Sequence, residues 1–228
     1  MEARFQLDLK VPDAVIKAYL PQGFTSSVAT QGPAKDCNVR LIFVDRITVN
    51  GADGKPVGKG NSRVAFFAAP VKDSSGANAQ LILGGLTDDE SAAPGPFGNY
   101  LLAATHEMKR TTSTTSSGAV VDTQDWVLQA KTGERLEMHI SYERGAANRS
   151  ARAQDVKYYS AKTPGFAEVS HQEQMLEILR NTTTNPPDKV KSFSLKIGGG
   201  SFEKFAPAAA QPLSWDNIVW LDRQISTP

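Results

Sequence analysis

The sequence has little of several features that define other classes of protein. It contains a single cysteine, Cys37, so an internal disulfide is excluded. No stretch approaches the roughly 20 apolar residues that a transmembrane helix requires. Its 25 lysines and arginines are scattered and balanced by 24 acids, whereas nucleic-acid binding needs a clustered basic excess. The composition therefore predicts a soluble globular protein with no nucleic-acid partner and no membrane partner.

Sequence motifs for phosphate, dinucleotide and metal binding are missing as well. The segment 58–62 is rich in glycine but lacks the spacing of a phosphate-binding loop, and there is no Gly-x-Ser-x-Gly nucleophile turn. The three histidines are too far apart in the sequence to form a metal-binding motif. We therefore expect no cofactor and no metal.

The cellular compartment stays open. A lone cysteine suits a cytoplasmic protein, but exported bacterial proteins also do without disulfides. The first residues run directly into a predicted strand and carry no signal peptide. The protein is therefore expected to be cytoplasmic or, if an export signal has been trimmed, periplasmic or secreted.

What the sequence does contain is the pattern of an antiparallel β protein. Apolar and polar residues alternate over 3–11 and again over 134–143, which is the period of a strand with one buried face. Longer apolar runs separated by Gly- and Asp-rich turns predict further strands at 38–49, 62–71, 79–86, 153–161 and 186–200. The stretch 212–226 fits a helix or a strand, and we favour a final strand.

Two segments are predicted to be helical. Pro12 stands at the start of the first and Pro21 stops it, with Val15, Ile16 and Tyr19 on one face. The second covers 170–181, where Ser170 and Glu173 have the spacing of a capping box.

About ten strands with two or three short helices make a mainly β (α+β) protein, and residues 1–228 are predicted to form a single domain. Because open sheet edges promote aggregation, we expect a bent antiparallel barrel-like fold or a closed double sheet.

The order of these elements, followed by the segment TDDESAAPGPFGNYLLA at 87–103, resembles the acetoacetate decarboxylase superfamily. That family has acids after a strand and then glycine, an aromatic residue, proline and two lysines. Here the corresponding positions are Gly98 and Asn99, followed by Tyr100, Leu101 and Leu102. The resemblance implies a barrel-like fold that encloses a pocket for a small acid.

The departure from the family pattern has a chemical consequence. The family forms a Schiff base between a neutral lysine amine and its keto-acid substrate, and leucine has no nitrogen. With Leu101 and Leu102 in place of the two lysines, the protein is predicted not to decarboxylate acetoacetate. If the fold is shared, these two side chains and Tyr100 line the pocket.

Three residues are candidates for acid–base catalysis. His106 lies on the strand that follows the loop, with Met108 and Arg110 on the same face and Glu107 on the other. Glu137 and His139 are two residues apart, so they share the polar face of a strand. In both cases a solvated surface position is the alternative interpretation.

Arginines within apolar strands suggest a site for a carboxylate. Arg40, Arg46 and Arg63 each lie in such a strand, and the guanidinium group matches a carboxylate ligand. An internal partner such as Asp45, Asp88 or Glu90 is an equal alternative. The predicted ligand-binding residues are Arg40, Arg63, Glu90, Tyr100, Leu101 and Leu102.

We therefore expect a protein that binds a small organic ligand, a carboxylate or keto compound, without covalent chemistry. The alternative is a lyase, hydratase or hydrolase that uses a His/Glu pair in the same cavity, and a structural or partner-binding domain is a third option. The sequence leaves open whether the chain forms a homo-oligomer.

Overall fold

The computed structural model describes residues 1–32, 34–91, 98–145, 148–178 and 189–226. These residues form twelve strands, one short α-helix and one 3₁₀ helix. In chain order the elements are β1 (Glu2–Lys10), α1 (Asp13–Lys17), β2 (Thr25–Ser26), β3 (Val39–Arg46), β4 (Ser62–Lys72), β5 (Asn78–Thr87), β6 (Tyr100–Thr114), β7 (Val120–Ala130), β8 (Arg135–Glu143), β9 (Asn148–Ser160), β10 (Ala167–Ile178), β11 (Val190–Gly198), η1 (Gly200–Phe205) and β12 (Ala209–Ser226).

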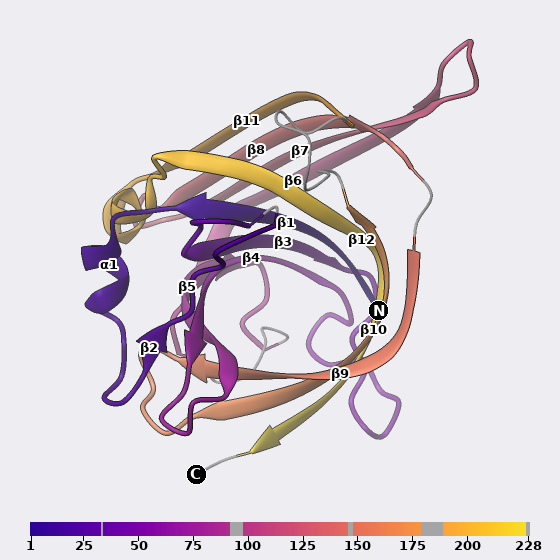
Figure 1. The fold of residues 1–228 in the computed structure, drawn as a ribbon. Helices are drawn as coiled ribbons and strands as arrows, with labels where there is room; N and C mark the ends of the chain where they lie inside the picture. Colours follow the sequence, from indigo (N-terminus) through magenta and orange to yellow (C-terminus); the bar gives the residue numbers. More distant parts are fainter. Residues whose placement is uncertain (33, 92–97, 146–147, 179–188, 227–228) are drawn as a thin grey trace.

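The strands form one large mixed sheet in the order β11-β8-β7-β6-β5-β9-β10-β12-β1-β3-β4-β2, with an additional pairing between β5 and β4. That pairing folds the sheet back on itself, as the curved ribbon in Figure 1 shows. The sheet as a whole is not closed into a barrel, because β11 and β2 stand at its two ends. The prediction of a mainly β protein is confirmed, whereas the prediction of a closed barrel is wrong.

Two parallel pairings make the sheet mixed rather than antiparallel. Strand β5 pairs in parallel with β6 at residues 85–87 and with β9 at residues 80–82. A parallel pair cannot be joined by a tight hairpin and needs a long connection. The acidic segment after Thr87 belongs to such a connection, since it leads from the end of β5 to the parallel start of β6.

The main core lies between two layers of the sheet. In Figure 1, β6, β7, β8 and β11 form an upper layer that covers β1, β3 and β4. One face of β1, β3 and β4 contributes Phe5, Leu41 and Phe67, and the facing layer contributes Trp126 and Ile140, all of which are buried. Alternation along each strand explains the arrangement, because every second side chain points to the same layer.

The opposite face of β3, β4 and β5 carries a second apolar cluster. Ile42, Val44, Phe66 and Ile82 are buried there together with Phe166, and Tyr100 and Tyr158 pack against them. In Figure 1, β9 and β10 sweep across this side of the molecule. The central strands are therefore apolar on both faces, as the uninterrupted run at 62–71 predicts.

The first helix forms where it is predicted, but over fewer residues. Pro12 occupies the position before α1, and Ile16 is buried in the main core. The second short helix, η1, follows Gly199 at φ 75°, a backbone angle that favours glycine. Within the described residues, no helix has both the length and the hydropathy needed to cross a membrane.

The helix predicted at 170–181 is wrong over the part that the structure describes. Residues up to Ile178 belong to β10, which pairs with β9 on one edge and with β12 on the other. Ser170 Oγ donates to Glu168 Oε1 at 2.8 Å instead of capping a helix. Two ladders of backbone hydrogen bonds outweigh a local capping signal, which is a small term in comparison. Residues 179–181 lie outside the described part of the chain.

The final strand is confirmed as β12, Ala209–Ser226, which pairs with β1 and β10. Tight turns at 115–119 and 131–135 join β6 to β7 and β7 to β8.

Candidate functional site

An open hollow forms where β5 ends and β6 continues. Strand β5 stops at Thr87, opposite Leu102, and β6 runs on to Thr114 with nothing from β5 beside it. Across this space Arg63 of β4 faces the middle of β6. The hollow has a volume of about 470 Å³ and is lined by Arg63, Ala104, Thr105, His106, Glu107 and Met108.

Arg63 is the fixed cation of this hollow. Its Nε lies 3.5 Å from Asp45 Oδ1, and Asp45 is the residue directly opposite in the β3–β4 ladder. Its Nη1 donates to the backbone carbonyl of His106 at 3.1 Å. This is the only hydrogen bond that its side chain makes among the described residues, although a guanidinium group carries five N–H donors. Arg63 is therefore held in place with donor capacity to spare.

His106 lies beside this arginine and has an acid behind it. Its Nδ1 is 3.7 Å from Asp88 Oδ2, which is too long for a hydrogen bond, and has no hydrogen-bond partner among the described residues. The His106 side chain is 42% exposed, whereas the Asp88 side chain is 10% exposed. Asp88 Oδ1 accepts a hydrogen bond of 2.6 Å from the backbone N–H of Arg63. Two residues selected from the sequence, Arg63 and His106, thus come together around Asp88.

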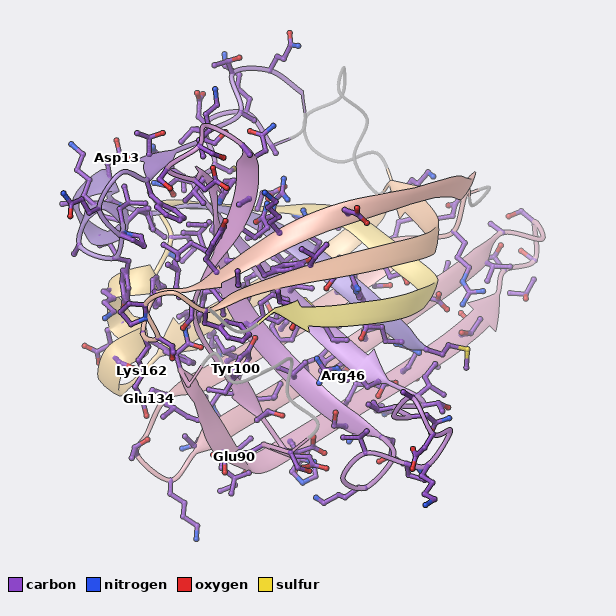
Figure 2. The ribbon with its side chains drawn as sticks, turned by 90° about the horizontal axis from the view of Figure 1, so that it is seen from below. Asp13, Arg46, Glu90, Tyr100, Glu134 and Lys162 are labelled. Carbon is purple, nitrogen blue, oxygen red and sulfur yellow. The ribbon has the colours of Figure 1, made fainter. Side chains whose placement is uncertain are left out.

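The two other acids at the start of the β5–β6 connection, Asp89 and Glu90, are not part of the hollow. Asp89 is buried, and its carboxylate accepts hydrogen bonds from the backbone N–H groups of Lys59 and Ser91, both at 3.0 Å. It thereby ties the loop that precedes β4 to the end of β5. Glu90, a predicted ligand-binding residue, is exposed and lies at the periphery in Figure 2. Residues 92–97 lie outside the described part of the chain.

Tyr100, Leu101 and Leu102 do not line one common pocket. Alternation sends Tyr100 to the second apolar cluster, where its ring lies 6.4 Å from that of Phe66. Leu101 packs against the main core on the other face. Leu102 is 52% exposed, so the expectation that it lines an interior is wrong. The reason is the strand period, because consecutive residues of β6 cannot face one cavity.

Each arginine in an apolar strand has an acidic partner. Arg40 Nε lies 3.6 Å from Asp8 Oδ1, and Arg46 Nε lies 3.5 Å from Glu2 Oε2. The internal-partner interpretation therefore holds for these two as it does for Arg63. Arg40 is also on the opposite face of β3 from Asp45, about 16 Å further along the strand. It does not join Arg63 at the hollow.

Glu137 and His139 lie on the outer face of the upper layer, away from the hollow. Their neighbours on β8, Leu136, Met138 and Ile140, point into the main core, so these two side chains point outward. His106, by contrast, is on the inner face of β6 because it lies opposite the buried Leu128. The alternative in which the Glu137–His139 pair acts as acid and base in the ligand cavity is therefore wrong for the hollow at Arg63.

The outer-face pair is nonetheless well ordered by its neighbours. Glu137 binds Arg135 and Lys196, and these two hydrogen bonds, in that order, lower the pKa of its carboxyl group. His139 Nδ1 lies 2.7 Å from Asp125 Oδ1, and its Nε2 lies 3.0 Å from Ser192 Oγ. The histidine of the pair therefore bonds not to Glu137 but to residues of the two neighbouring strands.

Sequence reasoning did not select Asp125 or Ser192. The signal for Asp125 was present, because the tight turn at 131–135 fixes the β7–β8 register and places Asp125 opposite His139. Ser192 lies on β11, far along the chain, and no local pattern sets its position beside β8.

No group of three or more His, Cys, Asp or Glu side chains suited to a metal ion occurs among the described residues. Comparisons of the chain with protein-family models, with curated proteins and with solved structures find no match.

Proposed function

We propose that this protein binds a small keto or hydroxy carboxylate in the hollow between Arg63 and His106, without covalent chemistry. The observation that carries the proposal is the unused hydrogen-bonding capacity of Arg63, which makes one side-chain hydrogen bond while it lines an open hollow of about 470 Å³. A carboxylate fits this group, because its two oxygens match the paired N–H groups of a guanidinium.

The position of His106 favours a ligand with a second polar group. Its imidazole lines the same hollow, and its Nδ1 lacks a hydrogen-bond partner among the described residues. A buried polar atom without a partner costs about 1–3 kcal/mol, so a ligand group that bonds to it recovers part of that cost. A keto or hydroxyl oxygen next to the carboxylate would bring the ligand within reach of both side chains.

The surrounding acids limit the affinity. Asp45 and Asp88 both lie close to the hollow and offset the positive charge of Arg63. Binding therefore depends on directed hydrogen bonds more than on net charge. We expect a dissociation constant on the order of 1 mM, which corresponds to about −4 kcal/mol.

The resemblance to the acetoacetate decarboxylase superfamily suggests an evolutionary origin for such a site. In this proposal the chain is a divergent member whose reactive amines have been replaced by Leu101 and Leu102. The position of the hollow supports it, since it opens directly after the segment that carries the resemblance. Small-acid recognition would have been kept while the Schiff-base chemistry was lost.

A second candidate is acid–base catalysis in the same hollow by a lyase or hydratase. The observation that favours it is the 3.7 Å distance between Asp88 Oδ2 and His106 Nδ1, which places an acid and an imidazole side by side at the hollow. Glu137 has no part in this mechanism because it lies on the outer face of the upper layer.

Thermal unfolding with a panel of small carboxylates, keto acids and ketones tests the binding proposal. A ligand at 100 times its dissociation constant stabilises the folded state by about 2.7 kcal/mol. For a chain of this length that shift corresponds to a rise in Tm of roughly 5 to 10 °C. Keto acids are expected to give the rise, and ketones without a carboxylate are expected to give none.

Two variants and a control locate the site. Arg63→Gln and His106→Gln should each weaken binding about tenfold or more, while Arg135→Gln, which changes an arginine on the outer face, should leave it unchanged. Equal binding by the wild type and Arg63→Gln would disprove the proposed site. Product formation from a keto or hydroxy acid that depends on His106 would favour the catalytic candidate instead.

A further inference from the structure

The outer face of the upper layer holds an aligned acid, histidine and serine. Asp125 of β7, His139 of β8 and Ser192 of β11 lie on three neighbouring strands. The Asp125 Oδ1 to His139 Nδ1 distance is 2.7 Å, and the His139 Nε2 to Ser192 Oγ distance is 3.0 Å. Both ring nitrogens are thus within hydrogen-bond distance of a partner, one on each side of the ring.

The donors and acceptors fix which way the chain of hydrogen bonds runs. An ionised carboxylate can only accept, so the proton on a neutral His139 ring is on Nδ1 and points to Asp125. Nε2 then carries the lone pair and accepts the hydroxyl proton of Ser192. This is the tautomer that a histidine needs to act as a general base toward a serine, with the acid holding the ring in place.

The three side chains are mounted on paired strands and not on loops. Asp125 and His139 are direct partners in the β7–β8 ladder. Ser192 lies at a register irregularity at the start of the β11–β8 ladder, between Val190 and Ser192. In the regular ladder that follows, Ser192 pairs with Ser141 and Ser194 pairs with His139, so Ser192 is a diagonal neighbour of His139 on the same face. Sites built on strands hold their geometry more closely than sites on loops.

We propose that Ser192 is a nucleophile that accepts acyl groups from carboxylic esters, with His139 as its general base and Asp125 as a positioning residue. The site is separate from the hollow at Arg63 and His106, and it does not depend on the function proposed there. All three side chains are partly or fully accessible, so an ester can reach the serine from solvent.

The chemical step follows from the hydrogen bonds. Ser192 Oγ forms a bond to the acyl carbon as its proton passes to His139 Nε2. The bond from the acyl carbon to the alcohol oxygen then breaks, and the same proton leaves with the alcohol. A water molecule, deprotonated by Nε2, attacks the acyl-serine, and Ser192 regains its proton as the carboxylic acid departs.

The open position sets what kind of activity to expect. Ser192 and Asp125 are exposed and His139 is partly exposed on this face of the sheet, so water reaches the acyl group. Water must then stabilise much of the oxyanion that preorganised donors stabilise in efficient hydrolases. We therefore expect slow acylation of Ser192 by activated esters of small acids, with an acyl-enzyme that can be observed.

Incubation of the whole protein with p-nitrophenyl acetate, followed by peptide mass spectrometry, tests the proposal. The acetyl group is expected on Ser192, at a rate about 10²-fold above that of Ser194, the next serine on the same face of β11. Ser192→Ala should abolish the modification, and Ser194→Ala should leave it unchanged. Equal acetylation of the two serines would overturn the proposal.

Two further variants separate the roles of the histidine and the acid. His139→Gln should lower the acylation rate of Ser192 about 10²-fold. Asp125→Asn should also lower it, and the ¹⁵N NMR shifts of the His139 ring should show a loss of the Nδ1–H form, which a purely structural role would not cause. Unchanged acylation in His139→Gln would refute the mechanism. These exposed substitutions should alter stability by no more than about 0.5 kcal/mol, so circular dichroism should show a folded protein in each case.

Discussion

The carboxylate of Asp8 lies 3.6 Å from the guanidinium group of Arg40, its direct partner across the β1–β3 ladder. Asp8 is buried, and its Oδ2 has no hydrogen-bond partner among the described residues. Burial raises the pKa of Asp8 from 3.8 to about 6, against the opposing effect of Arg40. This ion pair is therefore not a simple source of stability, because the fold disfavours the charge of its acid.

Asp8 is predicted to make stability fall as the pH rises from about 4 to about 6. The folded protein holds the Asp8 proton more tightly than the unfolded chain does, so ionisation near neutral pH costs roughly 3 kcal/mol. Asp8→Asn removes this cost, and its stability relative to wild type should therefore increase between pH 4 and pH 7. Urea unfolding at several pH values measures the change. Asp53→Asn, at an exposed position, is the control, and parallel curves for Asp8→Asn and wild type would contradict the prediction.

Glu134 is predicted to act in the opposite direction. Hydrogen bonds from Thr132 and from the backbone N–H of Ser201 lower the pKa of Glu134 from 4.5 to about 2. The stability that these bonds provide is therefore present above about pH 4.5 and is lost as the pH falls toward 2. Glu134→Gln should cost about 1 kcal/mol at pH 7 and progressively less in acid.

Acid titration of unfolding distinguishes this effect from a general loss of charge. Glu203→Gln changes an exposed glutamate in η1, the same short helix that Glu134 holds through Ser201, and should leave the profile of wild type in place. A loss of stability in Glu134→Gln that does not depend on pH would argue against the role of its charge.

Gly85 is predicted to tolerate no side chain. A Cβ at this position would lie 2.5 Å from the carbonyl oxygen of Ala65 and 2.8 Å from Cβ of Phe66, on the neighbouring strand β4. Gly85→Ala should therefore destabilise the fold by about 1–3 kcal/mol. Gly198→Ala is the matched control, because a Cβ at this strand position meets nothing within 4 Å. Urea unfolding should separate the two variants, and similar midpoints would show that β4 and β5 can move apart.

The protein is predicted to form no Schiff base with acetoacetate. Leucines stand at 101 and 102, and none of the described residues that line the hollow between Arg63 and His106 is a lysine. Incubation with acetoacetate followed by borohydride reduction should leave the mass of the protein unchanged. A reduced adduct on any lysine, located by peptide mass spectrometry, would show that an amine elsewhere has taken over the chemistry.

Local patterns predicted the strands well and one helix badly. Alternation of apolar and polar residues predicts β1 and β8, and a run of apolar residues predicts β4. These patterns arise because a strand buried on one face or on both needs apolar residues at the buried positions. The segment after Ser170 carried a helix capping signal, yet it forms β10 because strands on both edges supply its backbone hydrogen bonds. Pairing with those two strands depends on the tertiary structure, and the residues of β10 itself do not predict it.

The candidate site was predicted only in part for a similar reason. Arg63 and His106 could be selected as residues that are chemically unusual in their strands, and Asp45 and Asp88 were weighed as partners of the arginine. Their meeting at one hollow depends on where β5 ends relative to β6, which the sequence does not state. The resemblance of 87–103 to a family motif groups Tyr100, Leu101 and Leu102, and the strand period separates them in the structure.

The sequence by itself determined that this is a mainly β protein, which strands join in tight hairpins, and that leucines stand at 101 and 102. Only the tertiary structure decided that β5 pairs in parallel with both β6 and β9, that a hollow opens beyond Thr87, and that Ser192 lies beside His139. Hairpin registers follow from a few neighbouring residues. Pairings between distant segments depend on how the whole chain buries its apolar faces, so no single segment of the sequence predicts them.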